Sequence, residues 1–216
     1  MPINFPNLYN LDLFAKGGPV MFILLGFSIL ALAIILIKLI HFGIVRISNT
    51  NGLEKIILKL NGTNAKKLLN EINKIKNPIA RVVEVVILTK NDRRFDKESR
   101  ESEIERISSI QIRNLENYLG GLEVIASISP LLGLFGTVLG MIKAFLNLEK
   151  AGSQIDPALL AGGIWEALLT TAFGLAIAIP ALAAYHLFEN KIANTKDKMK
   201  DAIIRVNTLL NFRRKR

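Results

Sequence analysis

One acidic side chain, Glu166, lies where a membrane protein can use it for ion transfer. It stands directly before 22 residues without Asp, Glu, Lys or Arg, and nine residues after Pro157, the expected start of a helix. At 1.5 Å per residue, the carboxylate then lies roughly 13 Å along the helix axis. An acid at membrane depth is costly and by default indicates a functional site, often for ion or proton transfer. The alternative is a position at the headgroups beside Trp165, a residue type typical of the membrane interface.

Two threonines occupy apolar segments and form the second candidate group. Thr137 lies within residues 124–142, and Thr171 lies within residues 167–188. A threonine in a membrane helix often only donates a hydrogen bond to the carbonyl one turn back, and this structural interpretation stays open. The other interpretation is a polar lining, in which the two hydroxyls face each other or a central space and pass an ion along.

Small residues recur every three or four positions on the same two segments. The glycines of these faces are Gly133, Gly136 and Gly140 in the first segment and Gly174 in the second. In lipid such faces let helix backbones approach closely, so helix packing is the favoured interpretation. Pro130 and Pro180 each free a carbonyl one turn back and predict kinks, which alone do not imply an ion pathway.

The elements that carry these residues are predicted to be membrane helices. Three segments lack charge: residues 17–37, 124–142 and 167–188 contain 21, 19 and 22 residues without Asp, Glu, Lys or Arg. About 20 apolar residues in a helix cross a ~30 Å hydrocarbon core. The chain has 216 residues, of which 50% are hydrophobic and 21% charged, so the charges are confined to the segments between the spans. These numbers exclude a single soluble domain and predict an all-α, polytopic membrane protein with three transmembrane helices.

The distribution of charge predicts the orientation. Residues 1–16 hold one Lys and one Asp, and residues 38–123 hold 16 basic residues (Lys or Arg) and 11 acidic ones. Residues 143–166 hold 2 basic and 3 acidic residues, and residues 189–216 hold 9 basic and 3 acidic residues. Positive residues collect on the cytoplasmic side of membranes, which predicts an outer N-terminus and a cytoplasmic C-terminus. The net charge of +10 could also suggest nucleic acid. The basic regions lack the interleaved aromatic residues of a base-stacking surface, so nucleic-acid binding is not expected.

The chain therefore divides into alternating outer, membrane and cytoplasmic parts. We expect a short periplasmic segment at 1–16, spans at 17–42, 122–146 and 157–188, a cytoplasmic helical segment at 43–121, a periplasmic loop at 147–156 and a basic helical tail at 189–216.

Helical periodicity continues beyond two of the spans. A stripe from Asp96 runs into the second span with no turn signal before Gly120-Gly121, and a stripe from Ile192 continues the third. Two spans should therefore extend into a cytoplasmic helical bundle. Within the cytoplasmic segment, helix breaks are expected at Asn61-Gly62, at Asn77-Pro78 and around residues 91–95.

Other kinds of chemistry have little support. The chain has no cysteine, which excludes disulfides, thiolate metal sites and cysteine nucleophiles. Its two histidines, His41 and His186, are not spaced as metal ligands. No segment matches a glycine-rich phosphate loop or a hydrolytic triad, so neither an enzyme nor a cofactor is predicted.

Three motifs together resemble the MotA/TolQ/ExbB proton-channel family, in its three-span ExbB and TolQ branch. They are Lys16-Gly-Gly-Pro-Val-Met21, Ile128-Ser-Pro with Gly133-Leu-Phe-Gly-Thr-Val-Leu-Gly140, and Trp165-Glu-Ala-Leu-Leu-Thr-Thr-Ala-Phe-Gly-Leu175 with Pro180. The resemblance covers all three spans in order. It implies a homopentamer in the bacterial inner membrane whose second and third helices line a central pore.

The same resemblance assigns partners and roles. It implies a single-span ExbD- or TolR-like partner inside the pore, which carries an essential membrane aspartate, and a TonB- or TolA-like protein that receives the energy. The family's pore threonines fall on Thr137 and Thr171 and its third-helix glutamate on Glu166, while Thr170 adds a hydroxyl beside Thr171.

Three functions compete at this point. The leading hypothesis is a non-enzymatic stator subunit whose ion flow, of protons by family resemblance, supports TonB-dependent uptake. A TolQ-like role in envelope constriction is the alternative within the family. A structural membrane scaffold, whose small faces only pack, is the alternative of another class.

Overall fold

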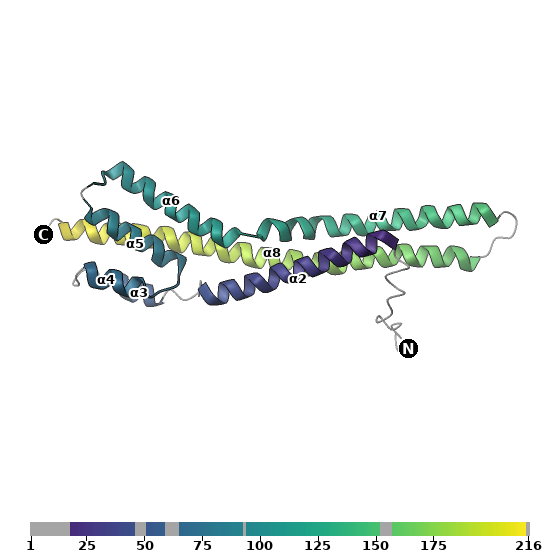
Figure 1. Ribbon diagram of the computed structural model, residues 1–216, viewed down its shortest axis with the longest axis horizontal. Helices are drawn as coiled ribbons and strands as arrows, with labels where there is room; N and C mark the ends of the chain where they lie inside the picture. The colour runs from purple at the N-terminus through teal and green to yellow at the C-terminus, as the bar shows by residue number, and fades with distance from the viewer. Residues whose placement is uncertain (1–17, 46–50, 59–64, 93, 152–156, 215–216) are drawn as a thin grey trace. The chain divides into compact units, whose positions relative to one another are not determined.

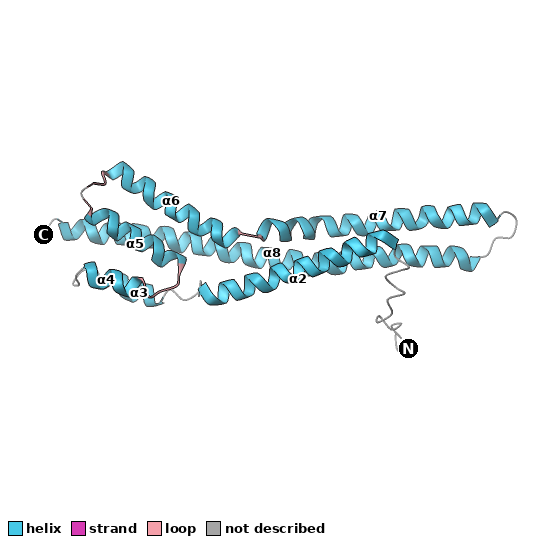
Figure 2. Cartoon of the chain, in the orientation of Figure 1, coloured by secondary structure: helices cyan, strands magenta, loops and turns pink. Residues whose placement is uncertain are grey.

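The computed structural model describes residues 18–45, 51–58, 65–92, 94–151 and 157–214, and every regular element within them is an α-helix (Figures 1 and 2). In chain order they are α2 (Gly18–Val45), α3 (Asn51–Leu58), α4 (Ala65–Ile72), α5 (Pro78–Asn91), α6 (Lys97–Glu116), α7 (Leu119–Ala151) and α8 (Pro157–Arg214). The all-α prediction is confirmed. The segment 1–16 and the break expected at Asn61-Gly62 lie outside the described residues.

Three of these helices are long and apolar enough to cross a membrane. They comprise Gly18–Val45, Leu119–Lys150 and Leu160–Phe212. Each of these helices contains one of the charge-free segments, except that the first helix begins at Gly18 and so leaves out Gly17. Apolar segments in a membrane favour a helix because all its backbone groups then form hydrogen bonds within the segment. The prediction of three membrane helices is therefore confirmed, and α8 continues from the third span into the basic tail as one helix.

The second span does not continue unbroken from the preceding helix, and that expectation is wrong. The helix α6 ends at Glu116 and α7 begins at Leu119, three residues after it and just before Gly120-Gly121. Between them, Tyr118 has a φ of 67°. A bulky residue rarely adopts this left-handed conformation, and the conventional turn signal of this region, Gly120-Gly121, lies inside the first turn of α7 instead of at the break.

The chain divides into two compact units. The first joins the described residues up to Leu36 with Tyr118–His186 and contains most of the membrane helices. Near the start of α2, the side chains of Val20, Met21 and Leu24 are buried. Elsewhere the spans expose large apolar side chains, as a surface in contact with lipid or other subunits does.

The second unit comprises Ile37–Asn117 and Leu187–Arg216. The helix α5 begins as predicted, with Pro78 at its first position and the Asn77 side chain accepting a hydrogen bond from the Ile79 amide at 2.9 Å. Asp96 caps α6 by accepting from the Ser99 amide at 2.8 Å. The core of this unit is aliphatic: its fully buried members include Val82, Val83, Val86, Leu115 and Val206.

A buried cation joins α2 to the end of α6 within this second unit. The Lys38 side chain is buried and its ammonium donates a hydrogen bond to the carbonyl of Leu115. The same ammonium lies 5.5 Å from the centre of the Phe42 ring, and Phe42 packs edge-on against Phe188. Because the last carbonyls of a helix lack partners and carry partial negative charge, Lys38 stabilises the end of α6.

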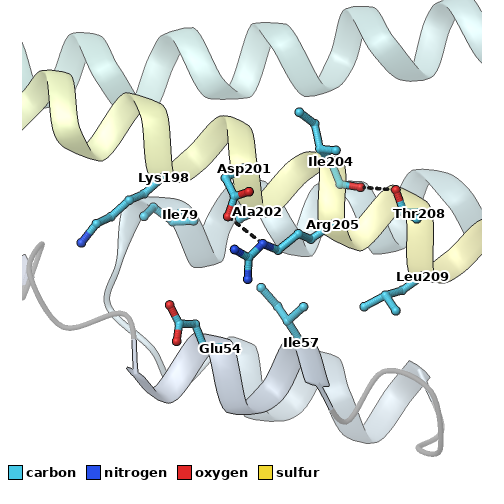
Figure 3. A pocket seen from close by; sticks show the side chains of 10 residues that line it. All are labelled: Glu54, Ile57, Ile79, Lys198, Asp201, Ala202, Ile204, Arg205, Thr208 and Leu209. Carbon is cyan, nitrogen blue, oxygen red and sulfur yellow. Dashed lines mark hydrogen bonds and ion pairs between the residues drawn. The ribbon is translucent and has the colours of Figure 1, made fainter.

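The second unit also contains a largely apolar groove of about 450 Å³ between α3, the start of α5 and the C-terminal part of α8. Figure 3 shows Ile57 of α3 on one side of it and the Asp201–Arg205 ion pair of α8 on the other. That pair spans one helical turn at 2.8 Å. Exposed pairs of this kind contribute little to stability. On α3, the apolar side chains of Ile56 and Ile57 are buried.

Candidate ion pathway on α7 and α8

Within the first unit, α7 and α8 pack through their small residues in an antiparallel register. Gly133 faces Gly174, Gly140 faces Ala167, and Ala144 faces Gly163, in order along the two helices. A Cβ added to Gly174 would lie 2.6 Å from the carbonyl oxygen of Ser129. Figure 1 shows the first part of α8 running beside α7. The glycines of both faces thus lie where the two helix backbones approach each other most closely.

The hydroxyl of Thr170 is buried in this interface. Its side chain is 2% exposed, and its Oγ1 lies 2.7 Å from the carbonyl oxygen of Ala167 and 3.2 Å from that of Gly133. A Cβ on Gly136 would lie only 2.6 Å from this hydroxyl oxygen. Thr170 is thus fixed between the two helices.

Thr171 and Thr137 are half-buried. Thr171 also directs its hydroxyl at the carbonyl of Gly133, at 3.2 Å, so that one carbonyl of α7 lies within reach of two hydroxyls of α8. Thr137 donates to the carbonyl of Leu134 on its own helix at 2.6 Å. The one-turn-back bond foreseen as an alternative is therefore present at Thr137, whereas Thr171 bonds across the interface.

Glu166 forms an ion pair with Lys143 of α7. The Glu166 Oε2 and Lys143 Nζ atoms are 3.6 Å apart, and the two side chains are 22% and 68% exposed. Both residues line a cavity of about 120 Å³, together with Thr170, small residues of α7 and the start of α2 at Gly18. The structure therefore brings Glu166 and Thr170 to one cavity, while Thr137 and Thr171 do not line it.

The remaining predicted residues lie on the same helices. Pro130 and Pro180 lie inside α7 and α8, which continue past them. Trp165 is exposed beside Glu166, as an interfacial residue would be. Within the described residues there is no cluster of three or more His, Cys, Asp or Glu that could hold a metal ion.

Comparison with known proteins identifies the family. The model of the MotA/TolQ/ExbB proton channel family matches residues 72–201, which include all of α7 and the membrane part of α8. The chain belongs to this family. The resemblance drawn from the sequence motifs is therefore confirmed.

Individual relatives carry ExbB and TolQ names. The chain is 30% identical over 191 residues to an ExbB homolog named for biopolymer transport in Methanothermobacter thermautotrophicus, a match that covers 88% of this chain and 66% of the relative. It is 40% identical over 108 residues to the biopolymer transport protein ExbB of Pseudomonas putida, a match that covers 50% of this chain and 32% of that relative. It is 40% identical over 101 residues to the Tol-Pal system protein TolQ of Haemophilus influenzae, a match that covers 47% of this chain and 44% of that relative. The match thus spans about two thirds of the first relative and less than half of the other two.

Two polar residues of this family member were not found from the sequence. Lys143 is the first charge after the segment 124–142, but only the antiparallel register of α7 and α8 brings it to Glu166. Ser129 is fully buried and donates to the carbonyl of Ile125 at 2.6 Å. It belongs to the Ile128-Ser-Pro motif, but no periodicity distinguishes it from the exposed Ser127.

Proposed function

We propose that this chain is the channel-forming stator subunit of an ExbB-type motor, which uses the proton-motive force to energise TonB-dependent transport at the outer membrane. The observation that carries the proposal is the cavity in the membrane unit, which is lined by the Glu166 carboxylate and the Thr170 hydroxyl. Polar groups inside a membrane are costly, and their collection on one helix pair favours ion transfer over simple packing. Thr137 and Thr171 extend the set of hydroxyls along the same helices.

The proposed assembly is the one that the family resemblance implies. Five copies surround a pore formed by α7 and α8, and a single-span ExbD- or TolR-like partner inside the pore supplies a membrane acid. A TonB- or TolA-like protein then receives the work. The protein lies in the bacterial inner membrane with its N-terminus in the periplasm, an orientation supported by the basic tail from Glu189 to Arg216.

The available driving force sets what the pathway has to do. One charge that crosses the membrane releases about 2.3 kcal/mol per 100 mV, which supports mechanical work only if ions do not leak. Hydroxyl groups along α7 and α8 can pass a proton or coordinate a cation between the cytoplasm, the Glu166 region and the partner's acid. The close helix contacts at Gly133 and Gly140 restrict other routes between these two helices.

The test is proton flux into vesicles that contain the chain and its single-span partner, measured with an internal pH-sensitive dye under an imposed potential. Thr137→Val, Thr171→Val and Glu166→Gln are each expected to lower the flux about tenfold, because each removes one polar group of the pathway; a tenfold loss corresponds to ~1.4 kcal/mol on the barrier to transfer. The matched control is Thr208→Val. Its hydroxyl is exposed and donates to the Ile204 carbonyl at 2.9 Å, outside the charge-free segments.

Gel filtration of each variant checks that assembly is intact. If all four variants conduct protons as fast as the unaltered protein, the channel is contradicted and the structural scaffold is favoured. A loss of flux in Thr208→Val as large as in the other variants would also contradict it, because the effect would then not depend on the membrane residues.

A TolQ-like function is the second candidate, since the relative in Haemophilus influenzae is named as a Tol-Pal system protein. The two functions share the same channel and differ in the partners that use it. Purification of the protein from its native membrane distinguishes them: a TolR-like and TolA-like pair in the preparation favours the Tol role, and an ExbD-like and TonB-like pair favours transport.

A further inference from the structure

A basic pocket lies in the second unit, at the end of α2. It has a volume of about 590 Å³ and is formed by the last turn of α2, the start of α3 and the turn between α4 and α5. Gly43 and Ile44 line it from α2, and Lys74 and Lys76 line it from the turn. The other lining residues are Gly52, Ile75 and Asn77. Among the lining residues that the structure describes, the two lysines carry the only charges, so the pocket is positive.

The charges of the two lysines are not neutralised by the protein. Both side chains are exposed, and within the described part of the chain neither forms an ion pair or a side-chain hydrogen bond. Acids of the neighbouring helices are engaged elsewhere: Glu84 pairs with Arg81 at 3.1 Å, and Glu54 lines the separate groove against α8. Lysine binds phosphate as a point charge, so this pocket is suited to an anion of that kind.

The position of the pocket along α2 matches the level of lipid headgroups. The charge-free part of α2 runs from Gly18 to Ile37, and its 20 residues cross roughly 30 Å, the thickness of the hydrocarbon core. Gly43 follows six residues later, roughly 9 Å further along the axis. Headgroups occupy roughly 5–8 Å on each side of the core. The pocket therefore lies at the outer edge of the headgroup layer.

An apolar stripe leads from the hydrocarbon core to the pocket. Ile37, Ile40 and Ile44 are three and four residues apart and so lie on one face of α2. Each is 50–61% exposed, and Ile44 itself lines the pocket. An acyl chain can lie along this stripe while its phosphate occupies the pocket. A free phosphate ion would gain nothing from the stripe, so the combination favours a lipid.

We propose that the basic pocket binds the headgroup of an anionic phospholipid, with Lys74 and Lys76 as its cationic contacts and the stripe of Ile37, Ile40 and Ile44 against an acyl chain. A zwitterionic lipid carries the same phosphate together with a cation, which the two lysines repel, so the anionic lipid binds in preference. Basic pockets beside membrane helices recognise anionic headgroups in this way. The bound lipid ties the turn between α4 and α5 to the membrane surface, whether or not the chain conducts ions.

The experiment measures lipid contact at the pocket by photo-crosslinking. The full chain is reconstituted into phosphatidylcholine vesicles that contain increasing fractions of a phosphatidylglycerol analogue with a diazirine on its acyl chain. After illumination, mass spectrometry measures the modified fraction of the segment 37–45, and the lipid fraction that gives half-maximal modification is compared between variants. A phosphatidylcholine analogue with the same diazirine is expected to modify the segment less at equal fractions.

Lys74→Gln and Lys76→Gln are each expected to raise the half-maximal lipid fraction about fivefold, the contribution of one basic residue near an anionic surface. The matched control combines Lys196→Gln with Lys200→Gln. It removes two exposed lysines of the same unit that do not line the pocket and should leave the half-maximal fraction unchanged. Gly43→Leu places a side chain where an added Cβ meets no atom within 4 Å, and it should weaken binding as much as the loss of one lysine, without a change of charge.

Unchanged half-maximal fractions in both single lysine variants overturn the proposal. An equal shift in the Lys196 and Lys200 control also overturns it, because the effect would then follow from net charge. Lys74→Arg with Lys76→Arg keeps both charges and is expected to bind as the unaltered protein does; a loss in this variant contradicts the assigned cause.

Two further arms identify the ligand. Equal modification by the phosphatidylcholine analogue overturns the preference for an anionic lipid and leaves a non-selective lipid surface. An excess of inorganic phosphate is expected to leave the modification undiminished, whereas displacement by inorganic phosphate overturns the lipid assignment in favour of a free anion.

Discussion

Replacement of Gly174 by alanine tests the close packing of α7 and α8 on which the proposed pathway depends. The new Cβ would lie 2.6 Å from the Ser129 carbonyl oxygen, whereas ordinary contact begins at 3.4 Å, so the two backbones have to separate locally by the difference of 0.8 Å. The atom that it meets belongs to the backbone of a helix and cannot rotate away. Overpacking of this kind costs ~1–3 kcal/mol. The hydroxyl bond from Thr171 to Gly133, at 3.2 Å, would be stretched beyond hydrogen-bonding distance.

The assay is thermal unfolding of the purified protein in mild detergent, followed by circular dichroism. The control is Gly162→Ala in the same helix, where an added Cβ meets nothing within 4 Å. The control isolates the gain in helix propensity, up to about 1 kcal/mol. We expect Gly174→Ala to unfold ~2–12 °C below Gly162→Ala, from 2–4 °C per kcal/mol for a chain of this size. Equal unfolding temperatures would refute the contact between Gly174 and Ser129.

Two further predictions concern the second unit. Lys38→Met removes the donor to the last turn of α6 and should destabilise that turn by ~1–3 kcal/mol. Amide hydrogen exchange in this turn should then be faster than in the unaltered protein. The control Lys191→Met alters an exposed lysine and should leave exchange in this turn unchanged. Hydrogen bonds from Arg94 lower the pKa of Asp92 from 3.8 to about 2, so the stabilisation by this pair is present above about pH 4 and is lost as the pH falls through 2. In a carbon-13 titration of the Asp92 carboxyl, Arg94→Gln should move the midpoint back toward 3.8, and Arg106→Gln should leave it near 2; an unmoved midpoint in the first variant would contradict the assigned cause.

The membrane helices could be predicted from the sequence because hydropathy is a local property. Each charge-free segment forms a helix in the structure, and the start of α5 at Pro78 follows from its capping residues. The break before α7 could not be predicted in the same way. It depends on Tyr118, whose φ of 67° is not typical of its residue type, and it lies beside the carbonyl that Lys38 caps from a helix about 80 positions away in the chain.

Glu166 and Thr170 could be chosen as candidates from the sequence, whereas Lys143 and the arrangement of these three residues could not. Thr170 and Thr171 are adjacent, but successive residues of a helix point about 100° apart. Only the rotation of α8 against α7 decides that Thr170 is buried and Thr171 half-buried. Likewise, Glu166 is conspicuous in the sequence, whereas its pairing with Lys143 depends on a register set by glycine contacts.

The same contacts indicate why this chain is suited to act with partners. The small residues of α7 and α8 are used in packing these two helices together, and in each candidate span only 22–28% of the most apolar window is buried. Most of the span surface is therefore left for lipid or for other subunits. None of the three charge-free segments contains an acid at mid-depth, so a carboxylate that takes up protons there has to come from another chain or from Glu166.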